Sequence, residues 1–419
     1  MLGKRIIWVL LLALGAAVSC SRNWDFLPDS GGSSGAMEPP ARQAVTQVRN
    51  VMIMISGGHN SLSSYLSDDL ADIAAGYLPE GTDAESNVLM VLARLPENYY
   101  STTSVPVLYR MYRDEEGSVV RDTLKRWGAD DRLFGGTVIH DALQMVRDRV
   151  PARSYGVVLS SHASGWMPCG YYNKPSDFER QSIGLRSIGQ DEDGSVSVEM
   201  DLMDFAAAIP FRLDYMVLDC CLSGGVEVAW ALSGKADKVA FTQTETMADG
   251  FDYVKIVRRL LEEKQPNPLG VCEDFYNYYK AKTGVYQSAT ISLVDTRNME
   301  PLSTLCKSLF QKYRSALNSL DGDKVQGYFR YDRHYFYDLK DILVKAGITP
   351  AEEAQLDEAL SACVLYKAAT PWFMKGSTYG FELKHVCGLS MYLPSMGTTY
   401  LDNYYKNTIS WNQATALVE

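Results

Sequence analysis

Short apolar runs alternate with amphipathic segments along much of this chain, and this alternation constrains the fold more than any other feature of the sequence. The first run, 51–55, ends at a turn at 56–58, and Asn60 then caps an amphipathic segment that reaches Ala75. Runs that are apolar along their whole length are typical of strands buried on both faces, as in a parallel sheet covered by helices. We therefore predict an α/β fold with a mostly parallel central sheet flanked by helices.

The same pattern predicts the remaining elements. The predicted strands that follow lie at 88–92, 105–112, 155–160, 215–218 and 238–242, with helices at 137–149, at 200–209 and from 226 onward. After Phe251 longer helices are predicted at 253–263, 270–282 and 299–320, and strands at 288–294, 363–368 and 387–393 are interleaved with them. We expect a core at 49–250 and a largely helical C-terminal portion at 251–419 that packs on it.

The N-terminus predicts export. Two basic residues are followed by an apolar run at 6–14 and by small residues up to Cys20, a pattern typical of a signal peptide at 1–19. The run is too short for a spanning helix. The ending Ala17-Val18-Ser19-Cys20 is similar to a bacterial lipoprotein box, in which the cysteine is acylated, although Ala17 stands where leucine is usual. We expect Cys20 to anchor the chain to a membrane, on the periplasmic side or at the cell surface, with plain secretion as the alternative.

The segment at 20–48 is rich in Gly, Ser and Pro, and we expect a flexible linker there. The chain carries a formal net charge of −11, which disfavours nucleic acid as a partner and suits cationic ligands. Its 8 cysteines are scattered, and no pair has the CxxC spacing of a zinc site, so we expect no structural metal. If Cys20 is lipidated, an odd number of thiols remains and at least one is unpaired.

Two of the predicted strands end in residues that carry nucleophile chemistry. His162 follows the strand at 155–160, and Cys221 follows the strand at 215–218. Reactive groups in an open parallel sheet collect just beyond the carboxyl ends of its strands, so we expect the two side chains at one rim. A thiol beside an imidazole and at the start of a helix is readily deprotonated, which makes it a strong nucleophile. The alternative for Cys221 alone is a buried structural thiol.

Several motifs, in order, resemble those of the clostripain family of cysteine peptidases, relatives of caspases, gingipains and legumains. The resemblance covers most of the chain beyond its N-terminal segment, and it implies a caspase-like fold with 49–250 as the catalytic core. The similar segments are MIMISGGHN at 52–60 with LSDDL at 66–70, SHASGW at 161–166, LDCCL at 218–222 with EVA at 227–229, TETMADG at 244–250 and GLSMYLP at 388–394.

The resemblance implies a cysteine endopeptidase in which Cys221 is the nucleophile and His162 the general base. Their separation, 59 residues, is similar to the lead of about fifty residues that histidine has over cysteine in caspases. The backbone N–H groups of Cys221 and of the residue after the histidine, here Ala163, would bind the oxyanion.

Cleavage after Arg or Lys is also implied, because family members place acidic groups in the S1 pocket. Asp219 matches the acid two residues before the nucleophile, and Asp249 matches the second acid of the pocket. Two carboxylates in a partly dry pocket would hold a guanidinium by paired hydrogen bonds. The alternatives are a helix cap for Asp219 and a turn residue for Asp249. The expected partners are peptides and proteins with Arg or Lys before the scissile bond.

Two departures from the family pattern favour a different function. Ala163 stands where the family has glycine, and if the backbone there needs a positive φ, the oxyanion donor is displaced. Cys220 stands where the family has alanine, which creates a rival nucleophile and a potential vicinal disulfide with Cys221. The alternative is therefore a catalytically impaired surface lipoprotein that binds basic peptides through the retained pocket. We favour Cys221 as the nucleophile because it aligns with the family motif.

The polar segment between the histidine and the cysteine contains Lys174, Arg180 and Arg186. Family members are often activated by self-cleavage after a basic residue in this region, so these three are candidate cleavage sites, with an ordinary surface loop as the alternative. The residues DEDG at 191–194 resemble part of a calcium loop but lack its full alternation of ligands. We therefore expect no cofactor, with calcium as the remaining alternative.

Overall fold

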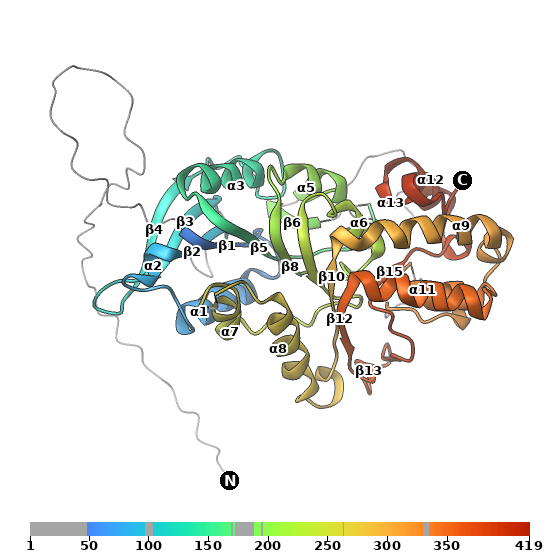
Figure 1. Ribbon diagram of the computed structural model, residues 1–419. Coiled ribbons are helices and arrows are strands. Elements are labelled where there is room, and N and C mark those ends of the chain that lie inside the picture. Colours follow the sequence, from blue (N-terminus) through green and yellow to red (C-terminus); the bar gives the residue numbers. More distant parts are fainter. Residues whose placement is uncertain are drawn as a thin grey trace, which may run out of the picture. The chain divides into compact units, whose positions relative to one another are not determined.

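Nine strands form one sheet in the computed structural model, which describes residues 48–96, 104–168, 171, 188–193, 196–262, 264–329 and 335–419. Their order across the sheet is β12-β10-β9-β8-β5-β1-β2-β3-β4 (Figure 1). The strands are β1 (Val48–Gly57), β2 (Asn87–Arg94), β3 (Val107–Arg113), β4 (Val119–Arg126), β5 (Ala152–Ser160), β8 (Leu213–Asp219), β9 (Ala236–Phe241), β10 (Thr290–Asp295) and β12 (Val364–Ala369).

The centre of the sheet is parallel, as the apolar runs predict. β1 pairs in parallel with β2 and β5, and β8 pairs in parallel with β5 and β9. The strands toward both edges run antiparallel, β3 and β4 beyond β2 and β10 and β12 beyond β9. The carboxyl ends of the five parallel strands therefore meet at one rim, where a site can be built from residues far apart in the sequence.

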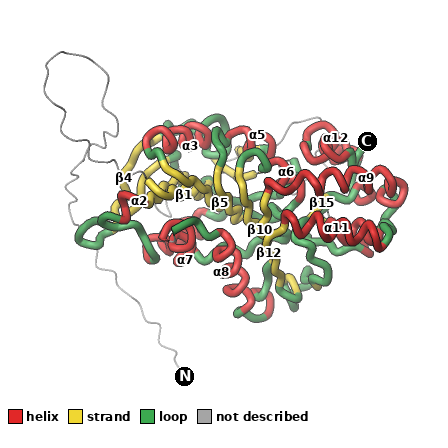
Figure 2. The backbone as a smooth tube through the Cα atoms, in the orientation of Figure 1, coloured by secondary structure: helices red, strands yellow, loops and turns green. Residues whose placement is uncertain are grey.

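Each central strand packs on both faces. In β1, Val51, Ile53 and Ile55 enter one buried cluster, whereas the alternate residues Met52 and Met54 enter another. Helices cover both faces, and the strands lie between two helical layers (Figures 1 and 2). This double burial confirms the predicted α/β architecture and explains why these strands read as continuous apolar runs.

The first cluster includes residues of α3 (Val138–Arg149), α5 (Leu202–Ala208), α6 (Val226–Ala231), α9 (Met299–Leu317), α10 (Leu339–Lys345) and α11 (Pro350–Cys363). The second includes residues of α1 (Ser63–Ala75), α7 (Tyr253–Val257) and α8 (Pro268–Lys280). The first cluster also includes residues of α12 (Thr399–Thr408) and α13 (Ser410–Thr415), and the short helix α2 (Asp83–Ser86) directly precedes β2. No helix in the described part of the chain has the length and apolarity needed to cross a membrane.

The structure adds elements that the apolar pattern did not predict. β4 is mostly polar and none of its residues is buried, because it forms an edge of the sheet. Within the segment read as polar, β6 (Ile188–Asp193) and β7 (Val196–Met200) form an antiparallel pair. Short pairs are also formed by β11 (Tyr337–Asp338) with β15 (Ser390–Met391), and by β13 (Trp372–Phe373) with β14 (Phe381–Glu382).

Residues beyond 250 contribute to the same sheet as those before it. β10 and β12 extend the sheet beyond β9, and the whole described chain belongs to one compact unit. The C-terminal portion also reaches the site end of the sheet, where the Ser390 N–H donates to the Gly224 carbonyl at 2.9 Å. The portions expected at 49–250 and 251–419 therefore share one sheet and one rim.

Candidate active site

His162 and Cys221 follow two neighbouring strands of the sheet. β5 and β8 pair in parallel with Ser160 opposite Asp219, so His162 and Cys221 each follow a paired residue by two positions. Parallel partners on adjacent strands lie about 5 Å apart. Both residues line a cavity of about 590 Å³ at the carboxyl rim. The rim position expected for the two side chains is thus the one the fold provides.

The imidazole of His162 is oriented by a serine that the sequence did not single out. Its Nε2 lies 2.9 Å from Oγ of Ser61, which precedes α1. Burial lowers the pKa of His162, so the ring favours its neutral form, the form that can accept a proton. A nucleophile, a base and a third group that orients the base are the usual parts of an activated nucleophile.

The two adjacent cysteines differ in access. Cys221 is half-buried and lines the cavity, and its Sγ lies 3.8 Å from the Thr246 carbonyl oxygen. Cys220 is 2% exposed and points into the interior, where its Sγ lies 3.7 Å from the Leu159 carbonyl oxygen. Burial raises the pKa of Cys220 well above that of an ordinary thiol. Cys220 is a thiol here, so the vicinal disulfide is not formed in the described structure.

The chain turns sharply after Cys221. Leu222 has a φ of 58°, a left-handed conformation that costs a non-glycine residue about 1 kcal/mol or more. Its N–H donates to the Thr244 carbonyl at 3.0 Å, which fixes the turn against the segment after β9. A Cβ on Gly165 would lie 2.5 Å from the Leu222 oxygen, so only glycine fits opposite this turn. The histidine motif and the cysteine turn are therefore packed backbone against backbone.

Ala163 is not strained. It is absent from the left-handed region, so the positive φ that alanine would resist is not required there. Ala163 forms an antiparallel bridge with Ile188, and the His162 carbonyl accepts from the Gly189 N–H at 2.9 Å. Because the C=O and N–H of one peptide unit point in opposite directions, the Ala163 N–H faces away from Gly189. An amide held in this way is suited to binding an oxyanion.

Asp219 lies in the cavity wall. Its side chain is 6% exposed and accepts hydrogen bonds from the hydroxyls of Tyr253 (2.8 Å) and Ser160 (3.3 Å). Burial raises the pKa of Asp219 to about 6, against the lowering effect of these hydrogen bonds. The carboxyl group is not a helix cap, because the helix cap before α6 is Gly225.

Asp249 does not line the cavity with Asp219, contrary to the expectation for the second acid of the pocket. Asp249 is about half exposed and does not line the cavity, and its carboxylate accepts from the Tyr278 hydroxyl at 3.0 Å. The next residue, Gly250, has a φ of 59°, and a Cβ there would lie 2.4 Å from Asp219 Oδ2. The turn therefore brings the backbone of Gly250, and not the side chain of Asp249, against the buried carboxyl.

Asp69 takes the place in the cavity wall that was expected for Asp249. It lies on α1, is 7% exposed and lines the cavity together with Asp219. Burial and, next, the charge of Asp219 raise the pKa of Asp69 to about 9. A signal for this residue was present in the sequence, because Asp69 lies three residues after Leu66 and four before Ile73, on the apolar face of the helix. An acid in an apolar stripe is costly unless it has a role.

The rest of the cavity wall is acidic and apolar. Its other acids are Glu199 and Glu245, and no Lys or Arg is among the described residues that line it. Apolar side chains come from Tyr65 on α1, from Met247 and from Phe373 and Met374 near β13. The cavity thus combines a thiol and an imidazole at the strand ends with negative charge in its wall.

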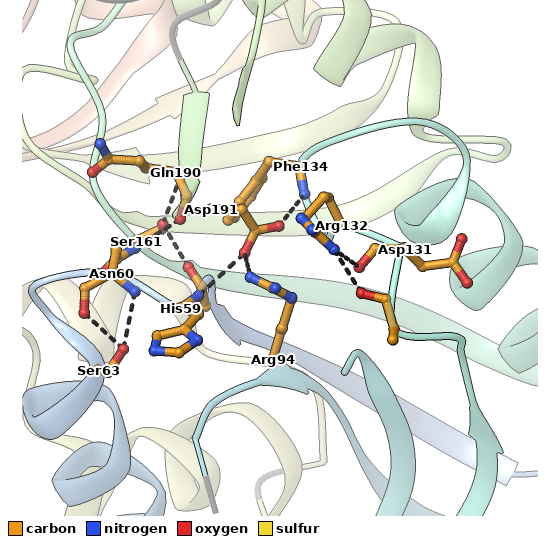
Figure 3. Close-up of polar contacts among 12 residues, drawn as sticks. His59, Asn60, Ser63, Arg94, Asp131, Arg132, Phe134, Ser161, Gln190 and Asp191 are labelled. Carbon is orange, nitrogen blue, oxygen red and sulfur yellow. Dashed lines mark hydrogen bonds and ion pairs between the residues drawn. The ribbon is translucent and has the colours of Figure 1, made fainter. Parts of the chain in front are cut away.

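The segment that carries Asp191 is fixed by a buried ion pair. Asp191 is fully buried and accepts from Arg94 Nη1 at 2.9 Å, from the His59 N–H at 3.2 Å and from the Phe134 N–H at 3.1 Å (Figure 3). These contacts involve both carboxylate oxygens, so Asp191 ties β6 to β2 and to the segment before α3. No group of three His, Cys, Asp or Glu side chains that could hold a metal ion occurs among the described residues.

The same contacts bring β6 against the rim. The Asn60 side chain donates to the Gln190 carbonyl at 2.7 Å, and a Cβ on Gly58 would lie 1.8 Å from that oxygen (Figure 3). Gly189 and Gln190 line the cavity as a result. Cys20, Lys174, Arg180 and Arg186, together with the signal peptide and all of the linker except Val48, lie outside the described residues.

Comparison with known proteins places this geometry in a family. The clostripain family model matches residues 54–416. A solved structure of an inactive zymogen of a C11 protease from Parabacteroides distasonis is 24% identical and covers 88% of this chain and 98% of its own, with a TM-score of 0.72.

A secreted C11 cysteine protease from Bacteroides thetaiotaomicron, "iotapain", is 21% identical over 88% of this chain and 99% of its own, also with a TM-score of 0.72. A second structure from that organism, a secreted C11 cysteine protease in complex with an irreversible peptide inhibitor, has a TM-score of 0.71 at 23% identity over 88% and 99% of the two chains. Among curated proteins none matches. These structures share the fold, and the family match over most of the chain shows that it belongs to the clostripain family of cysteine peptidases.

Proposed function

We propose that this protein is a cysteine endopeptidase that cleaves after Arg or Lys with Cys221 as nucleophile and His162 as general base. One observation carries the proposal: the thiol and the imidazole line one cavity at the ends of two paired parallel strands. His162 takes the proton of the thiol, and the Cys221 thiolate attacks the scissile carbonyl. The protonated imidazole then gives its proton to the leaving amine, and water hydrolyses the thioester.

Backbone amides hold the oxyanion in this mechanism. The N–H groups of Ala163 and Cys221 are the proposed donors, and the unstrained backbone at Ala163 supports that role. Losing one such donor costs an acyl-transfer enzyme about 10²–10³ in rate. The two departures from the family pattern gave the peptide-binding alternative its support. An alanine without backbone strain and a Cys220 thiol buried away from the cavity weaken that alternative.

The preference for Arg or Lys is supported by the charge of the cavity. Asp219 lies in its wall, and the described lining residues include no Lys or Arg. A buried carboxylate binds a guanidinium or an ammonium group more strongly than a surface carboxylate does, because little water competes. Neutral and acidic side chains would leave this charge uncompensated and would bind weakly.

Processing and anchoring complete the proposal from the sequence alone. We propose self-cleavage after Lys174, Arg180 or Arg186, which precede β6, the strand whose Gly189 and Gln190 line the cavity. We also propose export and acylation of Cys20, which would hold the peptidase at a membrane through the linker at 20–48.

A fluorogenic peptide assay tests the function. Wild type, Cys221→Ala and Cys220→Ala are assayed on matched peptides with Arg, Lys or an uncharged residue before the reporter group. Intact-mass analysis of the same samples detects cleavage between 174 and 186. Turnover of the basic peptides that disappears in Cys221→Ala alone supports the proposal. Turnover that survives in Cys221→Ala but disappears in Cys220→Ala would identify Cys220 as the nucleophile.

A further inference from the structure

Two carboxyl groups from different parts of the chain line the same cavity. Asp69 comes from α1 and Asp219 from the end of β8, and both are more than nine-tenths buried. Ser160, at the end of β5, donates to Asp219 at 3.3 Å, and hydrogen bonding by the same hydroxyl lowers the pKa of Asp69. The two acids are therefore joined through one hydroxyl, within the cavity that Cys221 also lines.

Hydrogen-bond donors are too few for two ionised acids. Asp219 has the Tyr253 hydroxyl at 2.8 Å and the Phe251 N–H in addition to Ser160. For Asp69, hydrogen bonding by the Ser160 hydroxyl opposes the rise of its pKa only in part. A serine hydroxyl carries one hydrogen, so donation to Asp219 leaves Asp69 without a donor. A protonated Asp69 resolves this, because it donates to Ser160 Oγ while Ser160 donates to Asp219.

The described titratable groups around Asp69 and Asp219 do not include a positively charged side chain that could neutralise a second carboxylate. The titratable groups that act on it are Asp68 and Asp72 on α1, Cys220 after β8, Tyr253 on α7 and Tyr279 on α8. The described cavity wall adds Glu199, Glu245 and His162. Of these groups only the imidazole can carry positive charge, and burial disfavours that form.

We propose that Asp69 and Asp219 bind the side chain of Arg or Lys together, as a pair that holds one proton while the cavity is empty and releases it to solvent when the cation enters. This inference rests on the proposed function, since it makes the pair the S1 site of that peptidase. It assigns to Asp69 the position that the family resemblance gave to Asp249. The bound cation supplies the positive charge and the donors that the second carboxylate lacks.

Because cation binding releases a proton in this proposal, the strength of binding depends on pH. Burial raises the pKa of Asp69 to about 9 and that of Asp219 to about 6, so near neutrality the empty pair carries a single negative charge. Binding a cation to two ionised carboxylates then requires the loss of one proton. This loss becomes easier as the pH rises toward the higher pKa, so preference for a cationic side chain increases over that range.

The test compares two peptides that differ in one charge. Fluorogenic peptides ending in Arg or in citrulline, an uncharged side chain of nearly the same shape, are assayed from about pH 6 to about pH 9, and the ratio of their kcat/KM values is taken. The ratio removes titration of Cys221 and His162. In wild type the ratio rises with pH. In Asp69→Asn it stays flat, close to the wild-type value at low pH and about 10- to 100-fold below it at high pH. Glu115→Gln, which removes an exposed charge between β3 and β4, follows wild type.

A binding measurement separates this inference from catalysis. Titration calorimetry of Cys221→Ala with an arginine peptide, in buffers of different ionisation enthalpy, counts the protons released. Near neutral pH we expect about one proton released per peptide, and none after Asp69→Asn is added. Alkylation of Cys221 in the Asp69→Asn enzyme, followed by mass, shows that the site is still folded.

The outcomes are distinct. An Arg-to-citrulline ratio that is high but independent of pH, and equal in wild type and Asp69→Asn, overturns the inference and leaves the proposed peptidase intact. Proton release on binding without turnover of either peptide supports the pair and overturns the peptidase. Equal binding of the Arg and citrulline peptides by Cys221→Ala overturns both.

Discussion

Two walls of the cavity are built differently. The strand-end wall consists of residues 160–163 and of Asp219, Cys221 and Leu222, at the ends of the paired strands β5 and β8. The outer wall consists of Ser61, Tyr65 and Asp69, before and on α1, and of Gly189 and Gln190 on β6. The strand-end wall holds the groups proposed to react, and hydrogen bonds of a continuous sheet fix it. The outer wall orients and charges the site, and it depends on contacts between separate elements.

The difference predicts which property of the site a substitution in each wall changes. Loss of Cys221 or His162 from the strand-end wall is expected to remove the chemistry, whereas a change in the outer wall alters position, charge or stability and leaves the nucleophile in place. The two walls meet through few contacts, among them the bond of Ser61 to His162 and the sharing of Ser160 by the two acids. Variants in each wall test this division, and they are ordered here by the size of their expected effect.

Removal of the nucleophile is expected to have the largest effect. Cys221→Ala should lower kcat for an Arg peptide by about 10⁴-fold or more, because a catalytic unit that loses its nucleophile loses nearly all its advantage. Cys220→Ala, one residue away and buried, should retain most activity. Steady-state kinetics with thermal unfolding of both variants provides the check. Comparable losses of activity at unchanged stability would show that the buried cysteine belongs to the site.

Loss of the buried ion pair between Arg94 and Asp191, which fixes β6 in the outer wall, should lower the stability of the protein. Arg94→Met leaves Asp191 buried and without its cation, which is expected to lower the free energy of unfolding by about 3–5 kcal/mol. The double variant Arg94→Met/Asp191→Asn should recover part of this loss, because it removes the uncompensated charge. Urea unfolding measures both. A loss of less than about 1 kcal/mol in the single variant is typical of a surface pair and would contradict the anchoring role.

The buried acid of the strand-end wall should affect substrate choice more than chemistry. Asp219→Asn is expected to lower kcat/KM for an Arg peptide by about 10²-fold, since a charge-assisted bond to the substrate is lost, and to change the citrulline peptide far less. Asp249→Asn is the matched control, and its exposed position predicts no more than a small change. Equal losses of kcat/KM in the two variants would show that Asp249 also binds the substrate side chain.

Removal of the Ser61 hydroxyl should have a smaller effect on activity, which acts only through the position of the His162 ring. Ser61→Ala removes the hydroxyl that lies 2.9 Å from His162 Nε2 and is expected to lower kcat by about 3- to 10-fold with little change in KM. Ser64→Ala, exposed in the first turn of α1, is the control. Recovery of activity in Ser61→Thr, which keeps the hydroxyl, separates positioning from general damage. A change in KM with constant kcat would instead place Ser61 in substrate binding.

The smallest effect is a shift in the pH profile. Because burial lowers the pKa of His162, the neutral base persists to lower pH than an exposed imidazole would allow. The acid limb of kcat/KM for the citrulline peptide, which avoids the carboxyl pair, should therefore lie below the ordinary imidazole value of about 6.5. An acid limb above that value would mean that a nearby charge, and not burial, sets the ionisation of the base.

Much of the strand-end wall could be predicted from the sequence. Continuous apolar runs identified β1, β5 and β8, and the polar residues directly after the last two pointed to His162 and Cys221. The outer wall was harder. β6 is short and lies in a segment that reads as polar, and Ser61 carries no pattern that distinguishes it from other turn serines. Asp69 interrupts an apolar helix face, a signal that is visible but does not say which cavity the carboxyl enters.

The sequence by itself determined the sheet and the two residues at its rim, because strand periodicity and the order of polar residues after a strand are local properties. Only the tertiary structure decided which acids share the cavity. Asp249 and Asp219 looked equivalent along the chain, yet a turn at Gly250 directs one outward, and packing of α1 brings Asp69 inward in its place. Which carboxyl is buried depends on how a helix docks against strands far away in the sequence, and no local pattern contains that information.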